Sequence, residues 1–178
     1  NKAFESPREK TIGFFARGDL YFSRDLHISF VCGAADPQLG EPPQLRRRFL
    51  DWADNNEPKL VCVRAEKAVT DLLRDVDERH ATSNLGIIEN IIADSVDSLL
   101  IFPESPGSFA ELGLFSANED ICKKMLIALL AKYQGDSFIT LGPVKHVSGR
   151  SSFAPLPIVL NEPFDNGFRQ IADRLLGE

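Results

Sequence analysis

Short apolar runs recur along the chain and are separated by longer segments that have helical spacing. The runs lie at 27–32, 60–63, 98–102, 125–130 and 157–160. Each is apolar over most or all of its length, which is typical of strands covered on both faces in a parallel sheet. The pattern therefore predicts five short, buried strands.

Between these runs, apolar residues recur every three or four positions, as on one face of a helix. Strands that alternate with helices predict an α/β fold, here a flavodoxin/Rossmann-like three-layer sandwich with a five-stranded parallel sheet. This domain is expected over 27–178, and residues 1–26 are expected to be an N-terminal extension packed on it. Helices are predicted over 44–55, 66–78, 85–95, 108–118 and 164–176, with a further short element at 137–140.

Composition and charge exclude several classes of protein. The 178 residues are 43% apolar and carry a formal net charge of −6. No run of about 18 apolar residues and no basic start followed by an apolar stretch is found, so neither a membrane span nor a signal peptide is expected, and the predicted location is the cytoplasm. The acidic balance argues against direct duplex binding. The basic group Arg46, Arg47 and Arg48 is interpreted as a solvated helix face.

The cysteines indicate neither a disulfide framework nor a zinc site. Cys32, Cys62 and Cys122 are far apart, odd in number and not part of any CxxC pair. Cys32 and Cys62 lie in apolar runs and are predicted to be buried thiols. We expect no metal and no cofactor.

The loop after the first strand is a candidate ligand-binding segment. In open parallel sheets, ligands bind at the carboxyl ends of the strands. Cys32, Gly33 and Ala34 are small residues at this position and would let a ligand approach the backbone closely. A simple tight turn explains the same residues equally well.

The loop after the third strand carries more information. It runs from a strand end through Pro-Gly into a helix start, and the first backbone N–H groups of such a helix can hold an anion or a polar sugar. Its candidate substrate-binding residues are Glu104, Ser105, Pro106, Gly107 and Ser108.

Glu111 is the candidate catalytic residue of this loop and helix. One alternative is structural, because Ser108-x-x-Glu111 fits a capping box in which Ser108 is the N-cap and the glutamate returns to its amide. Two observations favour function instead. Glu111 lies near the carboxyl edge of the sheet, and Gly113, a costly residue inside a helix, would make sense if a ligand needed its space.

The stretch IIADSVDSLLIFPESPGSFAELGLFSANED, together with GDSFITLGPVKHV, resembles the effector proteins of one retron class, which are bacterial anti-phage systems. Their effector domain is similar to nucleoside 2-deoxyribosyltransferases. The resemblance covers about residues 27–146. More distantly, Pro106 to Glu111 is similar to the PGGxGTxxE loop of the phosphoribohydrolase and nucleotide-sensing family.

The resemblance implies cleavage of an N-glycosidic bond. In the transferases, a glutamate before Leu-Gly attacks the anomeric carbon, and Glu111 stands in that place. An aspartate before the third strand helps to handle the leaving base, and Asp97 is the matching residue; capping of the strand entry is its alternative role. The sequence departs from many transferases in having Ser105 where they have an aspartate.

The expected function is therefore an N-glycosidase that cleaves the base–ribose bond of a nucleotide, either NAD (as substrate) or a purine nucleotide or nucleoside. It would be the toxic arm of an anti-phage system. The resemblance also implies a restraining reverse transcriptase with its RNA–DNA product, and a homo-oligomer. The alternatives are a non-catalytic nucleotide-sensing module and a housekeeping nucleoside 2-deoxyribosyltransferase.

Overall fold

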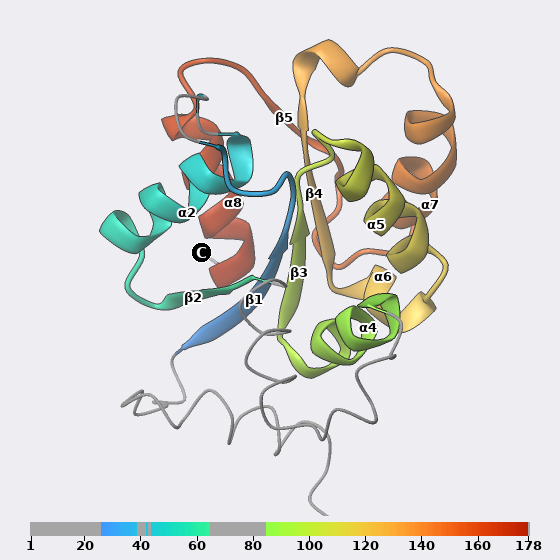
Figure 1. The fold of residues 1–178 in the computed structure, drawn as a ribbon, viewed down its shortest axis with the longest axis horizontal. Helices are drawn as coiled ribbons and strands as arrows, with labels where there is room; N and C mark the ends of the chain where they lie inside the picture. The colour runs from blue at the N-terminus through green and yellow to red at the C-terminus, as the bar shows by residue number, and fades with distance from the viewer. Residues whose placement is uncertain (1–25, 39–41, 43, 65–84, 178) are drawn as a thin grey trace, which may run out of the picture.

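The computed structural model describes residues 26–38, 42, 44–64 and 85–177 (Figure 1). Neighbouring strands pair in parallel in the order β2-β1-β3-β4-β5. The predicted five-stranded parallel sheet is confirmed. Its strands are β1 (His27–Cys32), β2 (Leu60–Val63), β3 (Ser98–Ile101), β4 (Met125–Leu130) and β5 (Ile158–Leu160).

The strand order contains one reversal. From β1 the chain moves outward to β2 and then returns to place β3 on the other side of β1. This is the flavodoxin-like order, in which a crevice opens at the carboxyl ends of the two strands flanking the reversal. The loops after β1 and β3 are therefore the ones that meet at the switch point.

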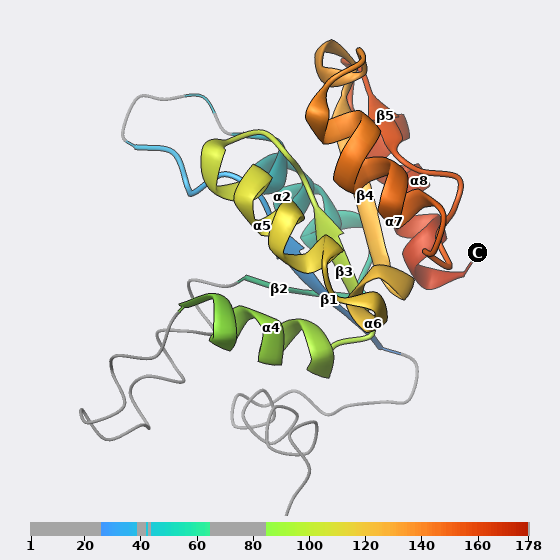
Figure 2. The ribbon, with the colours of Figure 1, turned by 90° about the vertical axis from the view of Figure 1, so that its right-hand side faces the viewer.

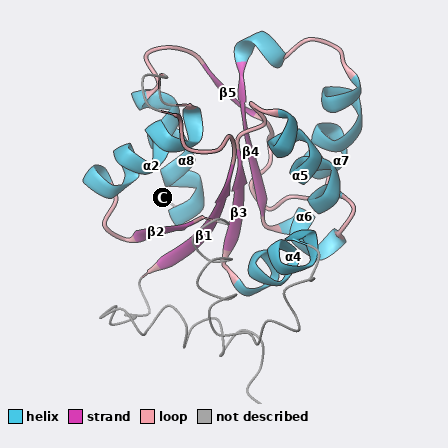
Figure 3. Cartoon of the chain, in the orientation of Figure 1, coloured by secondary structure: helices cyan, strands magenta, loops and turns pink. Residues whose placement is uncertain are grey.

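The helices form two layers around the sheet, as Figures 1 and 2 show. α2 and α8 cover one face, and α4 to α7 cover the other; Figure 3 shows the three layers by secondary structure. The helix predicted over 66–78 and the extension proposed for 1–26 lie outside the described residues, apart from residue 26. The described helices are α2 (Leu45–Asn56), α4 (Leu85–Ser95), α5 (Pro106–Ser116), α6 (Glu119–Lys123), α7 (Lys145–Ser148) and α8 (Asp165–Leu176).

The strands are apolar throughout because each face of the sheet has its own core. Successive side chains of a strand point to opposite faces. In β1, Phe30 and Cys32 join the core beneath α4 and α5, whereas Val31 joins the core beneath α2 and α8. None of the described helices is long and apolar enough to cross a membrane.

Two segments differ from the sequence prediction. α5 begins at Pro106 rather than at Ser108, because a capping residue lies earlier than expected. The predicted short element near 137–140 leads into a longer helical segment, a π-helix (Thr140–Val144) followed by α7. Pro143 lies inside that π-helix and has no N–H to donate, so propensity disfavours a helix there.

Candidate functional site

Glu104, in the loop after β3, joins the two loops at the switch point. Its Oε1 accepts hydrogen bonds from the backbone N–H of Ala34 at 3.3 Å and of Arg46 at 3.1 Å. Its Oε2 accepts one from the N–H of Leu45 at 2.8 Å. One carboxylate thus connects the loop after β3 to the loop after β1 and to the start of α2.

Glu104 also does the work of an N-cap for α2. Gln44 occupies the N-cap position but makes no side-chain capping bond. The first N–H groups of a helix need acceptors and favour a negative charge. The Glu104 carboxylate supplies both, so the anion position at this helix start is filled by the protein itself. Substrate contact by Glu104 stays a prediction.

Gly33 is explained by the packing of α2 against the loop after β1. A Cβ added at Gly33 would lie 2.7 Å from the Cβ of Arg46 and 3.2 Å from Oε1 of Glu104. The space that the sequence suggested for a ligand is therefore occupied by these two side chains. Cys32, just before it, is buried, and its carbonyl accepts the N–H of Phe102 at 3.0 Å, so β1 and β3 stay joined up to the loops.

Two serines close the capping box of α5. Ser105 is the N-cap, and its Oγ accepts the N–H of Ser108 at 3.2 Å. In return, Oγ of Ser108 accepts the N–H of Ser105 at 2.9 Å and that of Glu104 at 3.0 Å. Ser108 is fully buried, whereas Pro106 and Gly107 are exposed. The predicted N-cap position for Ser108 is therefore wrong, and the alternative of a box between Ser108 and Glu111 does not hold.

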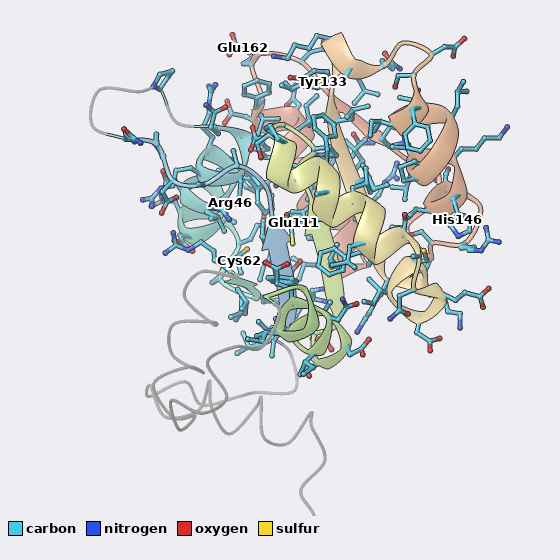
Figure 4. All side chains as sticks on the ribbon, turned by 45° about the vertical axis from the view of Figure 1, so that its right-hand side comes forward. Arg46, Cys62, Glu111, Tyr133, His146 and Glu162 are labelled. Atoms are coloured by element: carbon cyan, nitrogen blue, oxygen red, sulfur yellow. The ribbon has the colours of Figure 1, made fainter. Side chains whose placement is uncertain are left out.

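Glu111 lies on α5 about one turn beyond this box. Its neighbours on the inner side of the helix, Ser108, Leu112 and Phe115, are buried. Glu111 itself is half-buried, and its Oε2 atom is shielded from solvent. Figure 4 shows Glu111 on α5, over the sheet and apart from Tyr133 and Glu162, which follow the carboxyl ends of β4 and β5. The α5 cap does not account for this carboxylate.

Gly113 does not support the argument drawn from it. The residue is exposed, and a Cβ added there meets no described atom within 4 Å. A close approach of the protein's own described backbone is therefore not the reason for a glycine at this place.

Asp97 lies at the amino end of β3, whereas Glu104 to Ser108 follow its carboxyl end. Its Oδ2 accepts the N–H of Ile28 at 2.9 Å, and its own N–H donates to the carbonyl of Ile28 at 3.0 Å. These bonds extend the β1–β3 pairing by one residue. The structure thus places Asp97 at the opposite edge of the sheet from the loop, and its catalytic role stays a prediction.

Arg46 is a switch-point residue that sequence reasoning misplaced. It is 2% exposed, so the solvated helix face predicted for it is wrong, although Arg48 is exposed. Its Nη2 lies 4.0 Å from Oδ1 of Asp36, whose Oδ2 is 2.8 Å from Nη1 of Arg64. The signal was present: position 46 falls on the same helical face as Phe49, Leu50 and Ala53, which are all buried.

Glu89 is a buried carboxylate that the sequence reasoning did not single out. It is 7% exposed and lies on α4, on the side that buries Ile92 and Ala93. α4 and α5 pack beside each other on one face of the sheet (Figure 2). The spacing of 89, 92 and 93 at three and four residues was the available signal, but an acid in an apolar stripe is easily read as an exposed position.

A polar chain runs through the sheet at its amino edge. Nε2 of His27 lies 2.8 Å from Oγ of Ser98, which is 3.0 Å from Oγ of Ser29. Burial lowers the pKa of His27, and the nearby Asp97 carboxylate opposes this shift.

Of the two thiols predicted to be buried, Cys32 is buried, whereas Cys62 on β2 is only half-buried because β2 is an edge strand. Loss of water contact nevertheless raises the pKa of the Cys62 thiol to about 12, which keeps it protonated at neutral pH.

Comparison of the amino-acid sequence with known proteins identifies a family. Residues 42–175 match the family described as "STM3845 retron effector protein". The chain is 41% identical over 169 residues to the Escherichia coli protein named "Retron Ec86 putative ribosyltransferase/DNA-binding protein", covering 91% of this chain and 51% of that protein. It is 31% identical over 123 residues to the corresponding Escherichia coli protein of retron Ec73, covering 68% of this chain and 38% of that one.

The chain thus spans about half or less of the length of these curated relatives. The matched region includes α2, the loop after β3 and α5, which together carry Glu104 and Glu111. The chain belongs to the STM3845 retron effector protein family.

Proposed function

We propose that this domain cleaves the N-glycosidic bond between the base and the ribose of a nucleotide, with Glu111 as the carboxylate at the anomeric carbon. The observation that carries the proposal is the half-buried Glu111 carboxylate, which lies one turn into the helix after β3 and takes no part in the Ser105–Ser108 cap. The ribosyltransferase named in the relatives is a related glycosyl-transfer activity.

The chemistry needs a carboxylate at this point. When the C1′–N bond breaks, its electron pair leaves with the base and positive charge develops on the ribose. A carboxylate stabilises that charge or captures C1′ covalently, after which water adds at C1′ and its proton is released. From NAD the nicotinamide leaves neutral, so no acid has to protonate it. One carboxylate would then be sufficient.

A purine leaving group would need a second carboxyl group as proton donor. Asp97 is the candidate suggested by the family resemblance, but it bonds the Ile28 amide at the amino edge. Glu89 is the buried carboxylate on the helix beside α5. Asp97→Asn and Glu89→Gln would distinguish the two candidates. Replacing the residue that donates the proton should slow release of purine and leave release of nicotinamide largely unchanged.

A panel assay tests the proposal. The protein is incubated with NAD, purine nucleotides and deoxynucleosides, and free base is measured by chromatography. We expect base release by the wild type and a loss of at least about a thousandfold in Glu111→Gln, because the amide cannot stabilise the cation or form the covalent intermediate. Glu57→Gln, a change at the C-cap of α2 where the glutamate pairs with Arg169, is the matched control.

Each other outcome favours a different function. Binding of nucleotides without base release by the wild type would contradict the glycosidase and favour a sensor. Base exchange seen only when a second base is added would favour the transferase suggested by the relatives' names. Restraint by a reverse transcriptase with its RNA–DNA product, and assembly into a homo-oligomer, are further parts of the proposal, to be tested by co-purification.

A further inference from the structure

A surface groove lies on the α2 and α8 side of the sheet, where α2 passes the loop that joins β5 to α8. Its volume is about 630 Å³, within the usual range for ligand sites. α5, which carries Glu111, belongs to the layer on the opposite face of the sheet (Figures 1 and 2). The groove is therefore separate from the proposed catalytic site.

Aromatic rings form the floor of this groove. Trp52 of α2 is half-buried, and Phe164 and Phe168 are buried. The ring centre of Phe168 lies 6.1 Å from that of Trp52 and 5.8 Å from that of Phe164. All three residues line the groove, so a ligand bound there would contact aromatic rings.

Two arginines of the protein already lie against these rings. The guanidinium of Arg48 is 4.5 Å from the ring centre of Phe164, and that of Arg169 is 5.4 Å from the ring centre of Trp52. Each guanidinium also lies within 3.2 Å of a glutamate carboxylate oxygen. A planar, weakly hydrated guanidinium stacks well on a ring and pairs well with a carboxylate. The surroundings of the groove are therefore suited to arginine side chains.

The charge around the groove is negative. Asp51, Glu162 and Asp165 contribute three carboxylates, and Arg48 contributes one guanidinium. The side chains of Asp51 and Glu162 are 54% and 73% exposed. Glu162 pairs with Arg48, and Asp51 makes an exposed pair with Arg47 on its own helix, a kind of pair that contributes little. Asp165 is exposed and has no ion pair among the described residues. This charge disfavours a phosphate and favours a cation.

We propose that the groove is a docking site for an arginine-bearing segment of a partner protein. An incoming guanidinium would stack on the Trp52 ring and donate to the carboxylates of Asp51 and Asp165, which lie on α2 and α8. Most of the lining residues are exposed, so the groove is open to solvent. An open, aromatic-lined groove suits a peptide segment that crosses the surface. The contact itself would not involve Glu111.

The single tryptophan of the chain makes this docking site observable. Because Trp52 forms part of the floor, its fluorescence should change when a guanidinium stacks on the ring. The probe is a pentapeptide that carries two arginines between glycines and is blocked at both ends. We expect a saturable change at peptide concentrations below about 1 mM. Lysine in place of both arginines should weaken binding about fivefold, and glutamate should abolish it.

Variants of the protein test the role of the carboxylates. The double variant Asp51→Asn with Asp165→Asn keeps the size of both side chains and should bind the arginine peptide about tenfold more weakly. Calorimetry with the same peptide gives a second readout that does not depend on tryptophan. Asp136→Asn, a change at an exposed aspartate of the segment after β4, is the matched control and should bind like the wild type.

Several outcomes would overturn the inference. These are no response to the arginine peptide up to about 1 mM, equal binding of the arginine and lysine peptides, or equal binding by the double variant and the control. Spermidine that binds as tightly as the peptide would assign the groove to a small cation. Trp52 fluorescence that depends on protein concentration would assign it to a second copy of the chain. None of these measurements uses base release, so the inference and the proposed function can fail independently.

Discussion

Two glutamates, Glu104 and Glu111, lie seven residues apart in the same loop and helix and have opposite surroundings. Glu104 accepts hydrogen bonds from three backbone N–H groups that belong to two other segments. Glu111 lies inside α5 on the core side and takes no part in the cap. A carboxylate that accepts three backbone N–H groups is suited to fixing the fold, whereas Glu111 takes no part in the cap of α2 or of α5 and is the residue that we assign to the proposed chemistry.

The comparison also shows why the type of residue alone is a poor guide. Both glutamates follow the carboxyl end of the third strand, and both were candidates for contact with substrate. Their difference comes from the long-range partners of Glu104, which lie 58 to 70 residues earlier in the chain.

The largest expected effect on stability comes from replacing Glu104, and it distinguishes Glu104 from Glu111. Glu104→Ala should lower the free energy of unfolding by about 2–3 kcal/mol, because it removes charge-assisted bonds and the cap of α2. Glu111→Gln should change it by less than about 1 kcal/mol. Urea unfolding followed by circular dichroism measures both. Equal losses in the two variants would show that the division of roles is wrong.

A second change tests the close packing that Glu104 completes. Gly33→Ala should cost about 1–3 kcal/mol of unfolding free energy, because the new Cβ would lie 2.7 Å from the Cβ of Arg46. Gly107→Ala is the control, since its Cβ would make only an ordinary 3.9 Å contact with Oγ of Ser105. A tolerated Gly33→Ala would mean that the loop after β1 can shift without loss.

The third test concerns the amino edge of the sheet. Asp97→Ala should lower the unfolding free energy by less than about 1 kcal/mol, because its bond to the Ile28 amide is exposed to solvent. Asp97→Asn keeps an acceptor and should behave like the wild type in stability. If Asp97→Asn nevertheless abolishes base release, Asp97 has the role that the family resemblance implies, despite its place at the amino edge of the sheet.

The smallest effect is a dependence on pH. The pKa of His27 is lowered by burial in the folded protein, so the unfolded chain binds the proton more readily. The contribution of His27 to the free energy of unfolding should therefore be complete above the ordinary pKa of about 6.5 and decrease as the pH falls below that value. In His27→Gln that part of the slope should disappear, whereas it should persist in His146→Gln, a change at an exposed histidine. Thermal melts of the wild type and both variants between pH 5 and 8 would measure this pH dependence.

Much of the fold was predictable because it depends on local patterns. The apolar runs marked the strands correctly, since both faces of the sheet are covered by helices. The start of α5 was missed by two residues because two serines, Ser105 and Ser108, both fit the N-cap pattern, and only the geometry distinguishes them.

The site was less predictable because its key contacts are non-local. That Glu104 caps α2 depends on how β1 and β3 align, which no local pattern encodes. Arg46 and Glu89 were overlooked for a different reason: charged residues are almost always exposed, and here their position on a helix face overrides that tendency.

The contacts of Glu104 have a consequence for the order of folding. They join parts of the chain about 60 residues apart, so they can form only after β1 and β3 have paired and the loop closure between them has been completed. Interactions absent from the folding transition state act mainly on the unfolding rate. The bonds of the Glu104 carboxylate would then form after the folding transition state. Glu104→Ala should increase the unfolding rate and leave the folding rate nearly unchanged.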